Sequence, residues 1–88
     1  MRLDKYLKTA RILKRREAAK ELALQQRVEV NGRIVKPSYE VEVGDQIVLR
    51  FGTRILEIRV LDIQKQVSKA NASLLFEVIS EKKIENKE

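Results

Sequence analysis

The stretch that decides the fold is residues 28–35, VEVNGRIV. Val28 and Val30 alternate with a glutamate, which is the period of a strand with one buried face. Asn31-Gly32 favours a two-residue type I′ turn, because both central residues of that turn need positive φ. The β-branched residues Ile34 and Val35 follow the turn and are expected to form the second strand, which runs back along the first. The stretch therefore predicts a β-hairpin.

Upstream of the hairpin, apolar residues recur at the spacing of one helix face. The first helix is predicted from Leu3, Tyr6, Leu7 and Ala10. The apolar register then shifts, which indicates a break over residues 11–14. From Arg15 onward good helix formers dominate, and they predict a second helix. We expect two short helices packed as a hairpin, whose close approach is permitted by Ala18, Ala19 and Ala23.

Downstream of the hairpin, Gly, Pro, Ser and Asp residues mark turns between apolar segments. Three further strands are predicted, at residues 46–51, 55–63 and 74–79. The polar residues 64–73 are expected to form a loop. The resulting fold class is α+β: an N-terminal helical hairpin with a β-hairpin, packed on a small, mostly antiparallel sheet.

The 88 residues suffice for one domain. We expect that domain to span residues 1–80, with a motif over about 1–50 and a β-rich completion over about 51–80. The mixed Lys/Glu end, residues 81–88, is expected to be a flexible tail.

The residue types argue against catalysis. Cysteine and histidine are both absent, which excludes disulfides, thiolate metal sites and thiol nucleophiles, and removes the usual general base near neutral pH. Asp4, Glu17 and Glu21 form no convincing carboxylate pair, and no glycine-rich phosphate loop or zinc spacing is present. We expect no enzyme, cofactor, metal ion or small-molecule substrate. With no signal peptide or membrane-spanning run visible, we expect a cytoplasmic protein without a membrane partner.

The positive charge is unevenly distributed along the chain. Residues 1–36 carry 11 Lys/Arg and 4 Asp/Glu, whereas residues 37–88 carry 8 Lys/Arg and 9 Asp/Glu. The net charge of +6 therefore comes from the first part alone. A polyanion is the partner that such a surface favours. The alternative is a solvated basic face that serves solubility.

The densest group of cations lies at the N-terminus: Arg2, Lys5, Lys8, Arg11, Lys14, Arg15, Arg16 and Lys20. A helix face with several cations can track the regularly spaced phosphates of RNA. If the first helix extends far enough, Lys8, Arg11 and Arg15 line one face, and Arg16 and Lys20 repeat this spacing on the second helix. Arginine favours RNA over a membrane surface, because its guanidinium bridges phosphate oxygens or stacks on bases.

Structural roles compete with RNA contact at some of these positions. Lys20 has Glu17 one turn back, and Lys8 has Asp4, so either lysine could form an ion pair within its own helix.

Arg15 and Arg16 are adjacent and cannot both face the same way, so one of them could be structural. Their spacing favours Arg16 as the RNA contact. Tyr6 could stack on a base, but its place on the inward apolar stripe favours the core.

An ordered set of short motifs and single residues runs through the first half of the chain: RLDKYL (2–7), Arg11, KRR (14–16), AAK (18–20), Val28, VNG (30–32), VKPS (35–38) and VGD (43–45). In this order the motifs resemble the ribosomal-protein-S-four type RNA-binding domain, over about residues 1–50. The resemblance implies an αL motif, in which two helices and a β-hairpin dock on structured RNA. The family often has a glycine just before the first hairpin strand, where this chain has Gln26-Arg27.

The whole chain resembles small stand-alone members of that family that act in bacterial ribosome-associated quality control. The resemblance implies three partners: the RNA of obstructed large ribosomal subunits, peptidyl-transfer RNA and RqcH, which adds C-terminal alanine tails. It implies RNA contact first for Arg2 and Arg16, both expected to be exposed, and then for Lys5, Lys8, Arg11 and Arg15. Other readings are a ribosome assembly factor, a heat-shock ribosome-rescue factor, or a module that binds proteins or anionic membranes.

Overall fold

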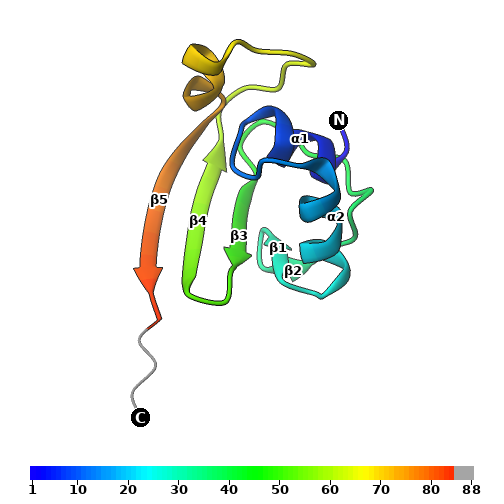
Figure 1. Cartoon of the computed structure of the whole chain (residues 1–88), viewed down its shortest axis with the longest axis vertical. Helices are drawn as coiled ribbons and strands as arrows, with labels where there is room; N and C mark the ends of the chain where they lie inside the picture. Colours follow the sequence, from blue (N-terminus) through cyan, green and yellow to red (C-terminus); the bar gives the residue numbers. More distant parts are fainter. Residues whose placement is uncertain (85–88) are drawn as a thin grey trace.

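The computed structural model describes residues 1–84 as two short helices that cover one face of an antiparallel sheet (Figure 1). The helices and strands follow one another along the chain as α1 (Leu3–Thr9), α2 (Arg16–Leu24), β1 (Val28–Val30), β2 (Arg33–Ile34), β3 (Gln46–Arg50), β4 (Arg54–Val60), η1 (Lys69–Leu75) and β5 (Phe76–Lys83). The five strands lie in the order β2-β1-β3-β4-β5, and every neighbouring pair is antiparallel. The predicted α+β fold class is confirmed.

The hairpin at residues 28–35 forms as predicted. Asn31 and Gly32 have φ values of 53° and 84°, the positive values that the turn requires. The Asn31 side chain fastens this turn to the start of β3: its amide donates to Asp45 Oδ1 at 3.0 Å, and its carbonyl oxygen accepts from Gln46 N–H at 3.0 Å. Asp45 is buried and also accepts a hydrogen bond from Glu42 N–H. The Asn-Gly and Gly-Asp turns therefore support each other.

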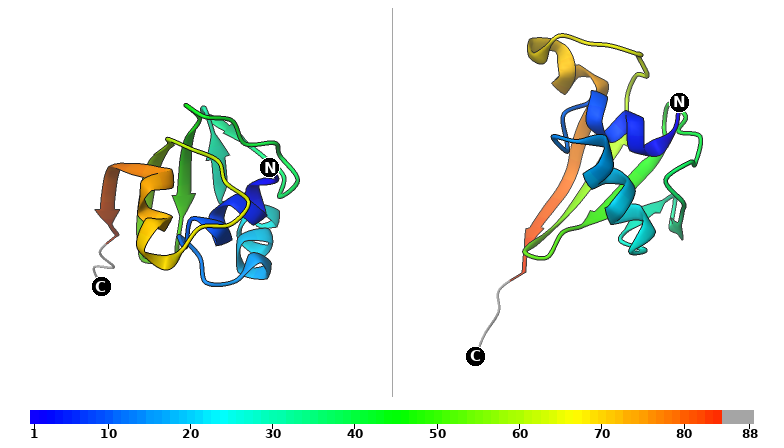
Figure 2. Two further views of the ribbon diagram at one scale, coloured as in Figure 1. Left: turned by 90° about the horizontal axis from the view of Figure 1, so that it is seen from above. Right: turned by 45° about the vertical axis from the view of Figure 1, so that its right-hand side comes forward.

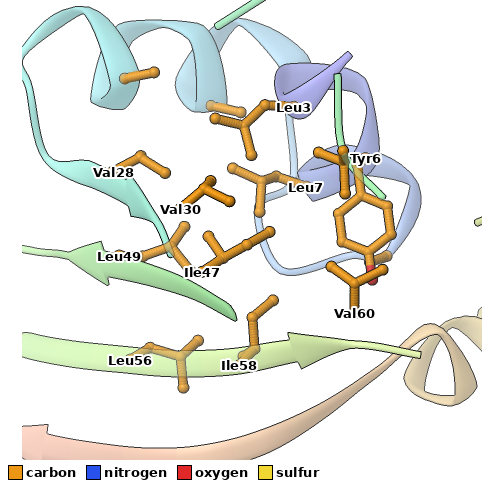
Figure 3. Packing of buried hydrophobic residues seen from close by; sticks show 14 of the residues in the cluster. Leu3, Tyr6, Leu7, Val28, Val30, Ile47, Leu49, Leu56, Ile58 and Val60 are labelled. Carbon is orange, nitrogen blue, oxygen red and sulfur yellow. The ribbon is translucent and has the colours of Figure 1, made fainter. Parts of the chain in front are cut away.

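The core lies between α1 and the helix-covered face of the sheet (Figure 3). Leu3, Tyr6 and Leu7 are completely buried, as the helical periodicity predicts. Figure 3 shows these side chains pointing toward Ile47 and Val60 of the central strands. The Tyr6 hydroxyl donates to Leu75 O at 2.6 Å, which satisfies its polar end and links α1 to η1. The prediction that Tyr6 belongs to the core is confirmed.

The two predicted helices are separated by a turn over residues 10–15, and they pack as a hairpin in which Ala19 and Ala23 are buried. Ala18 is exposed and does not serve this contact. Gln26, just before β1, has a φ of 62°. A residue other than glycine therefore adopts the left-handed backbone conformation here, where the family that the sequence resembles often has glycine.

The second half departs from the expected boundaries. Strand β4 ends at Val60, and η1 occupies residues 69–75, where a loop was predicted up to residue 73. Ala72 and Leu75 are buried, and their spacing of three suits a 3-10 helix, a signal too short to read from sequence. Strand β5 begins at Phe76 and continues to Lys83, because residues 81–83 pair with Arg54–Leu56. Strand β5 therefore extends beyond residue 80, and residues 85–88 of the expected tail lie outside the described residues.

Within residues 1–84, none of the helices is both long enough and apolar enough to cross a membrane.

Candidate nucleic-acid interface

The start of α1 is fixed by the loop that follows β2. Leu3 N–H donates to Tyr39 O at 2.8 Å, and Asp4 N–H donates to Pro37 O at 3.2 Å. These two carbonyl oxygens satisfy backbone donors that a helix N-terminus leaves without an intrahelical partner. Arg2, the N-cap residue, is extended and forms an isolated bridge with Glu40. The backbone of Arg2 is therefore held at a defined place on the surface.

A buried carboxylate joins the two helices at this place. Asp4 is only 2% exposed, and its two oxygens lie 3.2 Å from Arg2 Nη2 and 3.4 Å from Arg16 Nε. Asp4 Oδ1 also accepts Lys5 N–H at 2.8 Å. A buried charge is tolerated when it is paired and hydrogen-bonded. We call Arg2, Asp4 and Arg16 the Asp4 cluster.

The two arginines of the Asp4 cluster remain accessible. Their side chains are 46% and 47% exposed, as expected for RNA contact. Each guanidinium has five N–H donors, so donors remain after the ion pair to Asp4. Because one carboxylate orients both groups, they are held close together before any ligand binds. Such an arrangement suits phosphate oxygens, which arginine binds through parallel hydrogen bonds.

The structure brings together most of the other predicted contacts. Arg2, Lys5 and Arg16 line one hollow, and Lys8 and Arg11 line a second hollow nearby. The helix face predicted from Lys8, Arg11 and Arg15 does not form, because α1 ends at Thr9 and Arg11 lies in a turn with a φ of 59°.

Arg15 is exposed and is the N-cap residue of α2, and it lines neither of these hollows. Arg16 and Lys20 do share one side of α2, where they line a third hollow with Arg2, Asp4 and Glu17. The spacing predicted on the second helix is therefore present, whereas the one predicted on the first helix is not.

Lys65 is a basic residue that sequence reasoning missed. It lies in the loop after β4, and Figure 2 shows this loop (yellow) beside α1. Lys65 lines the hollow with Arg2, Lys5 and Arg16, and it also lines the hollow with Lys8 and Arg11. No local pattern around residue 65 indicates this position, because it depends on how the loop returns over the first helix.

Several cations of the sheet are compensated by ion pairs. Three arginines of the sheet have acidic partners, in the pairs Arg50–Glu29, Arg54–Glu81 and Arg59–Glu77. Among residues 1–84, the structure contains no side-chain ion pair at Lys5, Lys8, Arg11, Arg15, Lys20 or Lys65. The intrahelical pairs considered for Lys8 and Lys20 are therefore not formed. Residues 1–24, which form the two helices and the turn between them, carry 8 Lys/Arg and 3 Asp/Glu, so positive charge is in excess on the helical side of the molecule.

Comparison with known proteins identifies the family of the chain. The S4 domain family matches residues 1–47. The RQC P-site tRNA stabilizing factor of Streptococcus pneumoniae is 46% identical over 97% of each chain, and that of Halalkalibacterium halodurans is 42% identical over the full length of both chains. The trimeric structure of Heat Shock Protein 15 from Vibrio cholerae superposes with a TM-score of 0.84 at 36% identity, covering 91% of this chain and 82% of that one. The chain belongs to the S4 domain family.

Proposed function

We propose that this protein is an RNA-binding factor of bacterial ribosome quality control, which binds ribosomal RNA and peptidyl-transfer RNA on obstructed large subunits. The observation that carries the proposal is the Asp4 cluster, which presents two oriented arginines within a surface of excess positive charge. Support comes from the relatives named RQC P-site tRNA stabilizing factor, which match nearly the whole chain. The interface residues are Arg2, Lys5, Lys8, Arg11, Arg15 and Arg16, together with Lys65.

The proposed action is binding without catalysis. Within residues 1–84, no group of His, Cys, Asp or Glu side chains is placed to hold a metal ion, and the basic surface presents donors for phosphate. A protein that binds transfer RNA in one position stabilises that position by mass action, without any chemical step. The interaction should also depend strongly on salt concentration, because each neutralised phosphate releases counterions.

The finer part of the proposal concerns the partner protein. We expect the bound factor to hold peptidyl-transfer RNA while RqcH adds alanine residues to the stalled chain. The factor then acts in the cytoplasm, wherever obstructed large subunits accumulate. Immunoprecipitation of the tagged protein from cells should recover large subunits, peptidyl-transfer RNA and RqcH together.

The test of the interface uses a variant that removes both arginines without leaving a buried charge. Arg2→Ala/Asp4→Asn/Arg16→Ala removes the two guanidinium groups together with the carboxylate that orients them. The matched control, Glu29→Gln/Arg50→Gln, removes an ion pair of 2.6 Å on the sheet. In sedimentation with obstructed large subunits, the control should pellet like the unmodified protein, and the triple variant should remain in the supernatant. Normal sedimentation of a folded triple variant would overturn the proposed interface.

Arg2→Lys/Arg16→Lys adds a second arm to the same experiment. Lysine keeps the positive charges beside Asp4 but has no planar fork for bidentate hydrogen bonds. We expect binding of intermediate strength, closer to the triple variant at high salt. Full binding would mean that charge alone, rather than oriented guanidinium groups, is recognised.

A second candidate function is heat-shock ribosome rescue, favoured by the close superposition with Heat Shock Protein 15. The same immunoprecipitation distinguishes the two functions. Recovery of RqcH and alanine-tailed chains favours quality control by tailing. Recovery of obstructed subunits without RqcH, and only after heat shock, favours rescue.

A further inference from the structure

A groove of about 540 Å³ lies beside the Asp4 cluster, between α2 and the strand and loop that follow the Asn-Gly turn. Its apolar lining comes from both sides, with Ala23 and Leu24 on α2 and Ile34 and Val35 on the opposite side. Figure 2 shows the end of α2 next to the β1–β2 hairpin. The groove size falls in the range of small-molecule and nucleotide sites.

The walls of the groove are apolar and uncovered. Leu24 is 58% exposed and Ile34 is 56% exposed, although both are large aliphatic residues. Single exposed aliphatic residues are ordinary on protein surfaces. Here two of them, from different elements, line the same groove, so a ligand with an apolar surface would be buried by both.

The charges of the groove lining restrict the ligand further. Arg2, Lys20 and Lys36 line the groove, and no Asp or Glu among residues 1–84 does so. A ligand that fits must therefore join an apolar portion to negative charge. An RNA nucleotide has both, because its base has an apolar face and its phosphates are anionic.

The groove is continuous with the surface already assigned to RNA. Arg2 and Lys20 line the groove and also line the hollow over the Asp4 cluster. One RNA strand can therefore contact both. This continuity favours RNA over an acidic peptide or a membrane as the occupant.

Polar groups suited to a base edge lie within the same groove. Gln26 and Ser38 belong to its lining. Gln26 also holds the left-handed φ of 62°, a conformation in which glycine would be less strained. The Gln26 backbone caps the end of α2, because Gln26 N–H donates to Ala23 O and Arg27 N–H donates to Leu22 O. Its side-chain amide carries both a donor and an acceptor, which suits the edge of a base.

We propose that this groove holds one unpaired nucleobase of the RNA, with Leu24 and Ile34 against its faces, Gln26 at its edge, and Lys20 and Lys36 on the flanking phosphates. The proposal rests on the proposed RNA-binding function and adds a preference to it. The basic surface alone binds any structured RNA, whereas the groove selects RNA that displays an unstacked base.

The test compares two RNA probes: a fully paired stem, and the same stem with one unpaired adenosine. Burial of the apolar face of a base against two aliphatic side chains contributes enough for a preference of at least about 5-fold. The unmodified protein should show this preference by fluorescence anisotropy. Leu24→Gln/Ile34→Thr should abolish the preference and leave the affinity for the paired stem unchanged. The matched control, Leu74→Gln/Val78→Thr, changes residues exposed by 66% and 54% elsewhere and should keep the preference.

Gln26→Gly provides a readout that a purely structural role would not give. Glycine relieves the positive φ, so the melting temperature should rise, while the preference for the unpaired adenosine should fall. A rise in melting temperature with an unchanged preference overturns the role of Gln26.

The outcomes separate the groove from the basic surface. If the protein binds neither probe, both the proposed function and the groove assignment fail. If it binds the two probes equally, the groove assignment fails while RNA binding by the basic surface stands. If Leu24→Gln/Ile34→Thr keeps the RNA preference but loses a protein partner in immunoprecipitation, the groove is a protein-docking surface and the proposal is overturned.

Discussion

Asp4 determines how the two leading arginines can act. Sequence patterns led to both arginines, but they gave Asp4 no role beyond a possible intrahelical pair with Lys8. The structure places its carboxylate between Arg2, the N-cap residue of α1, and Arg16, the first residue of α2. This arrangement depends on how the two helices meet, and the periodicity of either helix carries no such information. Tyr6, in contrast, was placed correctly, because one local stripe of residues decides its orientation.

Arg2→Ala/Arg16→Ala should destabilise the protein, although both side chains are about half exposed. The double variant leaves the Asp4 carboxylate buried without cationic partners, at an expected cost of about 1–3 kcal/mol. Adding Asp4→Asn removes that charge and should restore most of the lost free energy of unfolding. Urea denaturation followed by circular dichroism measures both variants. A triple variant no more stable than the double variant would contradict this account of Asp4.

Tyr6 should make the protein sensitive to alkaline pH. Burial, and to a smaller extent the Asp62 carboxylate, raises the pKa of Tyr6 above its ordinary value. A phenol with a raised pKa in the folded state contributes stability that is fully present below the unfolded pKa of about 10 and is lost as pH rises above it.

Tyr6→Phe should therefore flatten the decline in free energy of unfolding above pH ~10. It should also lower stability near neutral pH by about 1 kcal/mol, because the 2.6 Å hydrogen bond to Leu75 is lost. Denaturation midpoints over a series of pH values test both effects. The same alkaline decline in the variant would show that another group, such as Tyr39, dominates it.

At the scale of elements, those that depend on interactions between neighbouring residues were predictable from the sequence, and those that depend on packing between distant parts of the chain were not. The β1–β2 hairpin was predicted because its turn chemistry is contained in Asn31-Gly32. The short helix η1 was missed, because it forms where Ala72 and Leu75 reach the core from a polar segment. For the same reason, the sequence did not predict that the loop before η1 contributes to the proposed interface. Its position over α1 is set by packing of the second half on the first.

Lys65→Ala should weaken RNA binding through that loop. If Lys65 contacts one phosphate, the slope of log Kd against log salt concentration should fall in magnitude by about 0.7–0.9. Lys82→Ala, on the edge strand β5, removes the same charge and should leave the slope unchanged. Anisotropy titrations with a ribosomal RNA fragment over a range of salt concentrations measure both slopes. Equal losses in the two variants would indicate an effect of net charge rather than a contact at Lys65.

At the scale of the whole molecule, the fold separates the basic surface of the helices from the sheet. The S4 domain match ends at residue 47, within β3, and strands β4 and β5 complete the sheet beyond it. The order of the elements and the fold class were predictable, because they follow from alternation and turn signals. The extent of β5 was not, because Glu81 and the two lysines after it resemble a solvated tail and become ordered only through pairing with β4.

A chain ending at Ser80 should be less stable than the full chain. It loses the pairing of residues 81–83 with Arg54–Leu56, together with the 2.9 Å ion pair between Glu81 and Arg54. We expect a lower melting temperature and an unchanged salt slope for RNA binding, since the basic surface lies elsewhere. An unchanged melting temperature would place the domain boundary at residue 80 after all.

The one-sided distribution of excess positive charge has a consequence for kinetics. A molecule with its excess positive charge on one side has a large electric dipole, and the field of a polyanion rotates such a dipole before contact. The protein should therefore approach RNA with its helices foremost, so that a large fraction of encounters is productive. Added salt should then slow association more than it speeds dissociation.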